Sequence, residues 1–533
     1  MPTEAKKASR PAPEGDEAAQ AGLFQQLGLI TRAISHSGVA RVLAWLVLGL
    51  VLVIVATAYG QIRLNAWNKP FYDALSRRDL HDFVVQLGVF FIIAFGLLVL
   101  NVAQKWLGEM LKLKLRDGLA HDLVRDWMLP RRAFWLANAG PMGVNPDQRM
   151  HEDARKLCEL SSDLGMGLLQ ASILFISFAG ILWQLSQDFV FRFGDRDYAV
   201  PGFMVWAAVL YAAAGSLVSY WVGGSLINRN SERYAREADL RFSLVRVNEH
   251  LDGIALAGGE PDERRRIELH LGNVLVATRR IVTGLTNLTW VTAGFGWVTI
   301  VAPILVAAPI YFAGKISFGG LMMAAAAFTQ AQSSLRWFVD NFSVIADWRA
   351  TLLRVASFRY ALTHTEALRE FDSRIDYSEG EAGTITISDL EIVSASGWDL
   401  LKEKKINVQA GERVLVIGAP GTGKTLLFRA LAGLWPWGSG RITHPRDEPI
   451  FYFPRGTPYL PRGSLREVLA YPAKVDAFDA ASFTHALRRL GLQRLEPLLD
   501  ETQRWDRELS QDEQICLAFA RIVVQRPRWV LVD

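Results

Sequence analysis

The stretch Gly418-Ala-Pro-Gly-Thr-Gly-Lys424-Thr425 matches the G-x-x-x-x-G-K-[ST] phosphate loop. An apolar run, Val414–Ile417, precedes it and predicts a strand, and the run from Leu426 to Ala432 predicts a helix. In this context the glycines turn backbone N–H groups towards phosphate oxygens, Lys424 reaches the outer phosphates, and the Thr425 hydroxyl ligates Mg²⁺. The sequence therefore predicts a nucleoside triphosphate site made by Gly418, Ala419, Pro420, Gly421, Thr422, Gly423, Lys424, Thr425 and Leu426.

A second nucleotide motif lies at the end of the sequence. Arg528-Trp-Val-Leu-Val-Asp533 predicts a buried strand that ends in an acid, and such an aspartate supports Mg²⁺. We therefore predict Lys424 and Asp533 as catalytic residues, with Thr425 and Asp533 at the metal. ATPases of this build usually carry a catalytic glutamate next and a histidine later. The sequence stops at Asp533, so we expect a domain truncated here that binds ATP and Mg²⁺ but hydrolyses ATP poorly.

The rest of the chain is predominantly apolar. Half of its 533 residues are hydrophobic, which is unusual for a soluble protein. Stretches long enough to cross a bilayer occur at roughly 42–62, 83–103, 164–186, 202–224, 285–312 and 316–335. A buried core helix explains one such segment but not six ahead of a soluble domain. The sequence predicts six transmembrane helices in contact with membrane lipid.

Lysine and arginine residues set the expected orientation. They are abundant between spans two and three (Lys105 to Lys156) and between spans four and five (Arg229 to Arg280), and scarce in most of the alternate loops. Because basic loops stay on the cytoplasmic side, both termini are expected there. These loops also explain the net charge of +4, so no nucleic-acid partner is predicted. The two cysteines, Cys158 and Cys516, predict no disulfide framework.

Composition predicts four segments. Residues 1–38 form a disordered tail followed by an interfacial helix, because Phe24, Leu27, Ile30 and Ile34 recur at helical spacing. Residues 39–361 form the transmembrane domain, and the polar stretch 362–384 is the linker. From residue 385 short β-type runs alternate with helices, which indicates an α/β nucleotide-binding domain over 385–533.

Several motifs support a resemblance to a known family. Six spans with two long cytoplasmic connections and a phosphate-loop domain resemble an ABC half-transporter of the exporter-type fold. The segments Leu64–Leu75, Asn145-Pro-Asp-Gln-Arg149, Glu237–Arg246, Ile254–Glu260 and Ala432–Gly438 are similar to one branch of it. That branch comprises the BacA-related peptide and vitamin importers and the peroxisomal fatty-acyl transporters.

The resemblance implies a fold, a partner and further site residues. It implies a homodimer in which Leu509–Gln514 of one subunit closes over the nucleotide of the other, with Ser510 and Gln514 as contacts. It also implies that Asn145–Asp153 and Ile254–Glu260 couple the ATPase to the membrane helices. The implied activity is ATP-driven transport of peptides or similar hydrophilic solutes, inward across a bacterial inner membrane.

This sequence departs from the family pattern at three places. Asp512 replaces a glycine of the Leu509-Ser510 motif, where a carboxylate and a Cβ oppose the approach of phosphate. Arg455 or Gly456 occupies the place of a γ-phosphate-sensing glutamine. Ser394 lies near the place of an aromatic residue that stacks on the base, with Trp398 the nearest candidate.

Other functions remain open at this point. Fatty-acyl export is the first alternative, and proton-driven transport with a degenerate ATPase domain is the second, although no titratable group is evident in the spans. A membrane-tethered kinase or GTPase is disfavoured because Leu509–Gln514 precedes the Asp533 strand, as in ABC domains. Polar residues within the spans are candidates for the solute path or for hydrogen bonds between helices, namely Gln170, Gln184, Asn287 and Gln330.

Overall fold

The computed structural model describes residues 22–35, 38–137, 146–187, 190–193, 196–363, 375–394, 397–400 and 403–533. The predicted disordered tail up to residue 21 and Asn145 lie outside this part of the chain. The chain divides into two compact units. The first contains Met1–Trp127 with Met142–Thr363, and the second contains Met128–Pro141 with His364–Asp533.

The first unit is helical. Its elements are α2 (Leu23–Ser35), α3 (Ala40–Arg77), α4 (Leu80–Trp127), α6 (Pro146–Gln148), the π-helix η2 (Arg149–Asp153), α7 (Ala154–Ser186), the hairpin β1 (Val190–Phe193) and β2 (Arg196–Ala199), α8 (Phe203–Gly223), α9 (Ser225–Glu249), α10 (Leu251–Ala257), α11 (Glu260–Phe312), α12 (Phe318–Asp340) and α13 (Phe342–Thr363).

Five helices within the described part of the chain are long and apolar enough to cross a membrane: α3, α4, the continuous helix Pro146–Ser186, α8 and α11. They coincide with the first five predicted spans. The sixth predicted span coincides with α12, whose glycine, serine, threonine and glutamine residues lower its hydropathy. Side chains from α3, α7, α8, α11 and α12 share one buried core, which includes Leu182, Met204, Ala324 and Phe328.

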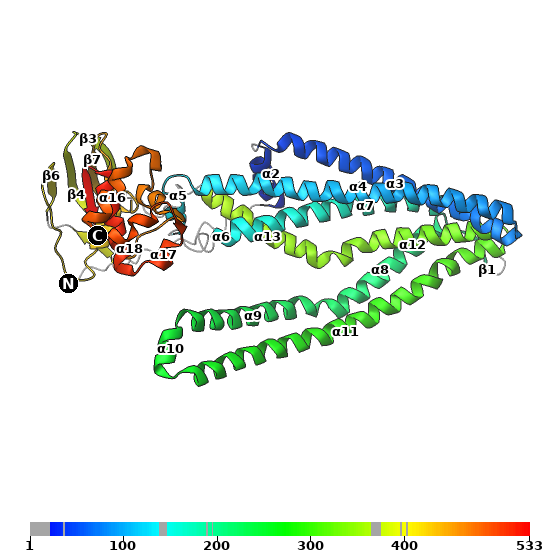
Figure 1. Cartoon of the computed structure of the whole chain (residues 1–533). Helices are drawn as coiled ribbons and strands as arrows, with labels where there is room; N and C mark the ends of the chain where they lie inside the picture. The colour runs from blue at the N-terminus through cyan, green and yellow to red at the C-terminus, as the bar shows by residue number, and fades with distance from the viewer. Residues whose placement is uncertain are drawn as a thin grey trace, which may run out of the picture. The chain divides into compact units, whose positions relative to one another are not determined.

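The long connections are extensions of the membrane helices, as predicted. Helix α4 runs without a break from its apolar part to Trp127, and α11 runs for 53 residues. Figure 1 shows α9 and α11 side by side, joined by the short α10. This geometry gives each basic connection a rigid path to a membrane helix.

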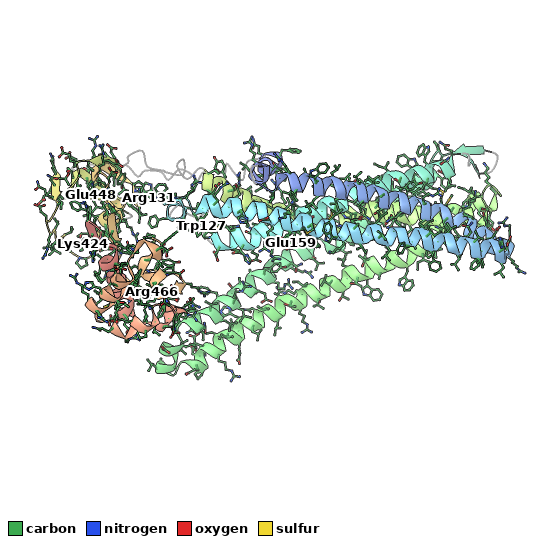
Figure 2. The ribbon with its side chains drawn as sticks, turned by 45° about the horizontal axis from the view of Figure 1, so that its top comes forward. Trp127, Arg131, Glu159, Lys424, Glu448 and Arg466 are labelled. Carbon is green, nitrogen blue, oxygen red and sulfur yellow. The ribbon has the colours of Figure 1, made fainter. Side chains whose placement is uncertain are left out.

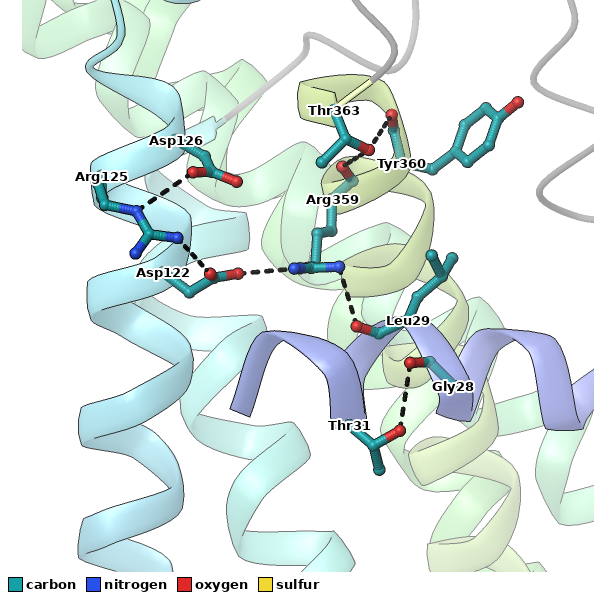
Figure 3. Close-up of polar contacts among 9 residues, drawn as sticks. All are labelled: Gly28, Leu29, Thr31, Asp122, Arg125, Asp126, Arg359, Tyr360 and Thr363. Atoms are coloured by element: carbon teal, nitrogen blue, oxygen red, sulfur yellow. Dashed lines mark hydrogen bonds and ion pairs between the residues drawn. The ribbon is translucent and has the colours of Figure 1, made fainter. Parts of the chain in front are cut away.

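The N-terminal helix α2 forms as predicted, and hydrogen bonds from α13 attach it to the helical unit. Phe24 is exposed, whereas the Gln26 side chain is fully buried and its Oε1 accepts a 2.6 Å hydrogen bond from Arg349 Nη1. Arg359 Nη1 of α13 donates to the Leu29 carbonyl, and its Nε donates to Asp122 of α4 (Figure 3). The apolar spacing predicted the helix but not this polar clamp, because the clamping arginines lie over 300 residues away in the sequence.

The second unit combines sheets with helices. Its elements are α5 (Arg132–Ala137), β3 (Asp376–Gly380), β4 (Thr384–Ser394), β5 (Gly397–Leu400), β6 (Lys405–Gln409), α14 (Lys424–Leu431), β7 (Gly438–Pro445), β8 (Ile450–Phe453), β9 (Gly463–Ser464), α15 (Leu465–Ala470), the 3₁₀ helix η3 (Val475–Ala477), α16 (Ala480–Arg489), the 3₁₀ helix η4 (Gln493–Leu498), β10 (Thr502–Gln503), α17 (Trp505–Glu508), α18 (Gln511–Gln525) and β11 (Trp529–Val532).

Two parts of the sheet structure matter for the site. Strands β3, β7, β4 and β5 lie in that order, and β6 also pairs with β4. Strands β8 and β11 pair in parallel, with Val532 opposite Phe453. A helical core built around Trp505, Phe483 and Leu517 adjoins α15, α16 and α18. Strand β11 forms at the predicted position and ends directly before Asp533.

The structure corrects two predictions for this unit. Residues 376–380 of the predicted linker form β3, which pairs in parallel with β7, because Tyr377 alternates with polar residues and packs against the sheet core. The predicted strand Val414–Ile417 is not a strand, and its four side chains are each at least half exposed. A strand requires a hydrogen-bonded neighbour. Among the described residues, no strand pairs with this run.

Candidate functional site

The phosphate loop connects an extended segment to α14. Gly421 and Gly423 have φ angles of 85° and 80°, a left-handed conformation that side chains with a Cβ rarely adopt. A Cβ on Gly418 would lie 2.8 Å from Thr422 Oγ1. The Thr422 hydroxyl donates to the Ala419 carbonyl at 2.8 Å and closes the turn. The loop therefore has the compact backbone that a phosphate group requires at the start of a helix.

Lys424 begins α14 and folds back over the loop. Its Nζ donates to the carbonyl oxygens of Gly418, at 2.6 Å, and Ala419, at 2.8 Å. Both acceptors belong to the loop, so the ammonium group already lies where the outer phosphates of a nucleotide would enter. The predicted role of Lys424 is compatible with this position.

Thr425 and Asp533 meet, although 108 residues separate them. The Thr425 hydroxyl donates to Asp533 Oδ1 at 3.2 Å. The Asp533 backbone N–H donates to the Phe453 carbonyl at 3.0 Å, so the pairing of β11 with β8 fixes its place. Asp533 Oδ2 is buried and lacks a hydrogen-bond partner among the described residues. A hydroxyl beside a carboxylate with one unsatisfied oxygen fits Mg²⁺, which prefers oxygen ligands. A bound Mg²⁺ would neutralise charge on the β- and γ-phosphates.

The segment Leu509–Gln514 builds the start of α18. Ser510 is the N-cap and its hydroxyl bonds to Glu513, which forms a capping box. Gln514 is buried and its Nε2 donates to the carbonyls of Asp506 and Leu509. The amide of Gln514 therefore shapes the loop from within, while Ser510 lies at the exposed end of the helix. Asp512, also exposed, lies in the first turn.

The segment after β8 lies next to this motif. Gly456 has a φ of 94°, so the chain turns sharply at the place of the missing glutamine. A cavity of about 680 Å³ lies between residues 457–462 and the start of α18, and Gln511 and Gln514 line it. The side chains of Ser394 and Trp398, considered for stacking on the base, lie outside the described residues.

Arg131 is a residue that the sequence reasoning missed. It precedes α5, which belongs to the nucleotide unit, and its guanidinium lies against the backbone of Gly433. The hydroxyls of Tyr377 and Tyr452 donate to the carbonyls of Ala430 and Leu431, at the end of α14. Together the three side chains stabilise the negative end of the helix that begins with Lys424. Figure 2 labels Arg131 and Lys424.

The surroundings of Arg131 are electrostatically distinctive. Burial raises the pKa of Tyr377, and the charge of Arg131 opposes this shift. Burial lowers the pKa of His444, and the charge of Arg131 lowers it further. A single basic residue ahead of a short helix gives no recognisable sequence signal. The predicted coupling segments lie elsewhere in the chain. Pro146–Asp153 and Ile254–Glu260 belong to the helical unit, whereas Arg131 belongs to the nucleotide unit.

Comparisons with known proteins agree with this geometry. Residues 30–312, more than half of the chain, match the family described as ABC transporter transmembrane region 2. Residues 401–533 match the ABC transporter domain. The chain belongs to the ABC transporter family. It therefore contains an ABC-type ATPase domain after an exporter-type helical domain, as predicted from its motifs.

Three similar proteins set this ABC transporter in context. The chain is 28% identical over 493 residues to the inner membrane ABC transporter ATP-binding protein YddA of Escherichia coli (strain K12), covering 91% of this chain and 85% of that protein. It is 24% identical to the human lysosomal cobalamin transporter ABCD4, over 87% of this chain and 80% of that protein. A solved structure of a bacterial Atm1-family ABC exporter with ATP bound matches with a TM-score of 0.68 at 17% identity, covering 92% of this chain and 86% of that chain. The last match shows the fold alone.

Proposed function

We propose that this ABC transporter is a homodimeric, ATP-driven half-transporter that moves peptides or similar hydrophilic solutes inward across a bacterial inner membrane. The observation that supports ATP use most directly is the meeting of Thr425 with Asp533. It unites two nucleotide motifs 108 residues apart and leaves one carboxylate oxygen for Mg²⁺.

Polar side chains in the membrane helices support a hydrophilic substrate. Polar side chains occur inside the apolar segments, including Gln170, whose Oε1 accepts a 3.0 Å hydrogen bond from Gln104. Such groups suit a wet path better than a path for an acyl chain. The similarity to an inner-membrane protein of Escherichia coli supports the proposed location in the inner membrane. The basic connections support a cytoplasmic position of the nucleotide domains.

Uptake of a toxic peptide that acts inside the cell tests this function. We expect the full-length gene to sensitise a bacterium that lacks its own importer, and Lys424→Ala to abolish the effect. Unchanged killing, together with ATP-dependent accumulation of acyl-CoA in inverted vesicles, would contradict peptide uptake and favour acyl export. Killing that persists in Lys424→Ala would favour the proton-driven alternative.

Thiol labelling tests the proposed orientation. Single cysteines replace Lys315, between α11 and α12, and Arg265, near the start of α11, in a chain without Cys158 and Cys516. We expect an impermeant reagent added outside to label the position of Lys315 and to spare that of Arg265. Equal labelling at both positions contradicts this orientation.

A further inference from the structure

Helix α3 carries buried polar groups without partners, which is unusual inside an apolar helix. Thr57 is 1% exposed and Asn65 is 5% exposed. Within the described part of the chain, Thr57 Oγ1, Gln61 Oε1 and both polar side-chain atoms of Asn65 lack a hydrogen-bond partner. The three residues recur every four positions, so they follow one face of the helix.

The behaviour of other threonines shows that Thr57 is an exception. Thr283, Thr286, Thr289, Thr292, Thr299 and Thr329 all donate their hydroxyls to the carbonyl four residues earlier in the same helix. This local bond is the usual way for a helical threonine to satisfy its hydroxyl. Thr57 does not make it, so its hydroxyl is available between helices.

Two contacts place α12 beside α3. Ala58 shares a buried core with Ala324, Ala327 and Ala331 of α12. Nearer the other end of α3, Asp73 accepts hydrogen bonds from Ser317 Oγ and from the Gly319 backbone N–H, each at 2.8 Å. The two helices are therefore antiparallel neighbours, and the positions of Gln61 and Asn65 fall between these contacts.

The alanines that α12 places beside Ala58 offer these polar groups no hydrogen bond. Ala324, Ala327 and Ala331 present only methyl groups, and each is at most 1% exposed. An unsatisfied buried donor or acceptor destabilises the packed state. Thr57, Gln61 and Asn65 would therefore gain hydrogen bonds if the packing beside them opened, while Asp73 holds α3 to the start of α12.

We propose that Thr57, Gln61 and Asn65 form a hydrogen-bonding track for the transported solute, which enters when the seam between α3 and α12 opens. This inference deepens the proposed function and rests on it. The track is uncharged and offers one hydroxyl and two carboxamides. It therefore suits a solute rich in amides, such as a short peptide, and would leave these groups unsatisfied against an acyl chain.

The dimensions of the track agree with such a solute. Eight residues of helix separate Thr57 from Asn65, which corresponds to about 12 Å at 1.5 Å per residue. An extended peptide covers about the same distance in three to four residues. The Asp73 contact would then be the latch that must open before a solute reaches Asn65.

Apolar substitutions of similar shape test the track. Thr57→Val, Gln61→Leu and Asn65→Leu are compared in the full-length protein with Thr289→Val, whose hydroxyl is bonded within its own helix. The assays are ATP-dependent uptake of a labelled tripeptide into proteoliposomes, stimulation of ATPase by that peptide, and the melting temperature in detergent. We expect each track variant to weaken the apparent affinity for peptide by roughly fivefold, as for a lost hydrogen bond. The melting temperature should stay equal or rise, and Thr289→Val should match the parent in all assays.

Two results would overturn the track. Unchanged peptide affinity in all three variants would show that these groups do not meet the solute. A parallel fall in melting temperature and transport would show that they hold the helices together, for example through buried water. If the parent lacks uptake while peptide still stimulates its ATPase and the variants lose that stimulation, the direction of transport is wrong and the track stands.

Thiol accessibility supplies a test of the opening that does not depend on measuring transport. Asn65→Cys, in a chain without Cys158 and Cys516, should react with a small hydrophilic methanethiosulfonate during ATP turnover, and added tripeptide should slow the reaction. A thiol that stays unreactive throughout turnover would contradict the opening of the seam.

Discussion

Arg354 binds both carboxylate oxygens of Asp153, across 201 residues of sequence. Its Nη2 donates to Oδ1 at 2.8 Å and its Nε donates to Oδ2 at 3.0 Å. Arg149 Nη1 donates to the same Oδ2 at 3.1 Å. Asp153 ends the π-helix before α7, so the pair fixes a basic connection to α13.

Removing either partner should destabilise the helical unit. The Asp153 side chain is 5% exposed, so Arg354→Ala leaves a buried carboxylate with one arginine fewer. We expect a loss of about 3 kcal/mol in the free energy of unfolding, seen as a lower melting temperature in detergent. Lys105→Ala breaks the exposed pair with Glu109 and should leave the melting temperature nearly unchanged. Equal effects of the two substitutions would contradict a structural role for the Asp153 pair.

Asp512 should slow ATP hydrolysis in this transporter. It is exposed in the first turn of α18, beside Ser510. In the proposed homodimer a carboxylate there would repel the phosphates of a nucleotide on the partner subunit. Two unit charges about 4 Å apart in water interact by about 1 kcal/mol, which corresponds to roughly fivefold in rate.

We therefore expect Asp512→Gly to raise the ATPase rate of the full-length protein at least about fivefold, by that same charge repulsion. Asp512→Asn removes the charge but keeps a side chain of nearly the same size, so it distinguishes an effect of charge from an effect of size. A gain in both variants assigns the effect to charge, and a gain in glycine alone assigns it to the Cβ. Unchanged rates in both would remove Asp512 from the site.

Glu448 should make the nucleotide unit sensitive to acid. Its carboxylate accepts hydrogen bonds from Trp529 Nε1, Arg528 Nη1 and the Gly383 backbone N–H. The bonds from Trp529 and Arg528 lower the pKa of Glu448 below its ordinary value of 4.5. Because the folded-state pKa is the lower one, this stabilisation is complete above pH 4.5 and is lost as the pH falls through the folded-state pKa.

Melting temperatures of the parent and Glu448→Gln check this expectation. The variant should melt lower at pH 7, and the difference should shrink as the pH falls below 4.5. Glu403→Gln, at an exposed position, should change the melting temperature little at pH 7. A constant difference between the parent and Glu448→Gln at all pH values would contradict the role of the ionised carboxylate.

Arg131 should link ATP hydrolysis to transport. Its guanidinium lies at the end of the helix that begins with Lys424, and α4 ends a few residues before it. We expect Arg131→Gln to keep ATP binding and much of the ATPase activity but to reduce transport per ATP. Arg489→Gln, on α16, serves as the control. Equal losses of ATPase and transport would show that Arg131 supports the fold of the site and not its coupling.

Features of the fold and the site were predictable where the residues that form them lie close together in the sequence. The phosphate loop, α14 and β11 form local patterns, so their positions were predicted correctly from the sequence. Asp533 was placed at the metal from its motif, and its contact with Thr425 agrees with that. The strand Val414–Ile417 was predicted wrongly because an apolar run specifies burial only if a neighbouring strand pairs with it.

The long-range features were out of reach for the same reason. The clamp on α2, the Asp153 pair and the contact of Arg131 with Gly433 each join residues more than 200 positions apart. Arginines and aspartates are frequent on helix surfaces, so no local pattern distinguishes these from solvated ones. Thr57, Gln61 and Asn65 were missed although their four-residue spacing on an apolar helix was a readable signal.

Complementation between two inactive variants tests whether the ATP site is shared by two subunits. Lys424→Ala removes the cation of the phosphate loop, and Ser510→Arg blocks the N-cap of α18; each variant alone should be inactive. If Ser510 of one subunit closes over the phosphate loop of the other, a heterodimer of the two variants has both lesions in one site and keeps one intact site. Co-expression should then restore part of the ATPase activity in the purified heterodimer. If both motifs instead acted within one chain, each chain would carry a damaged site and the heterodimer would be as inactive as either parent variant.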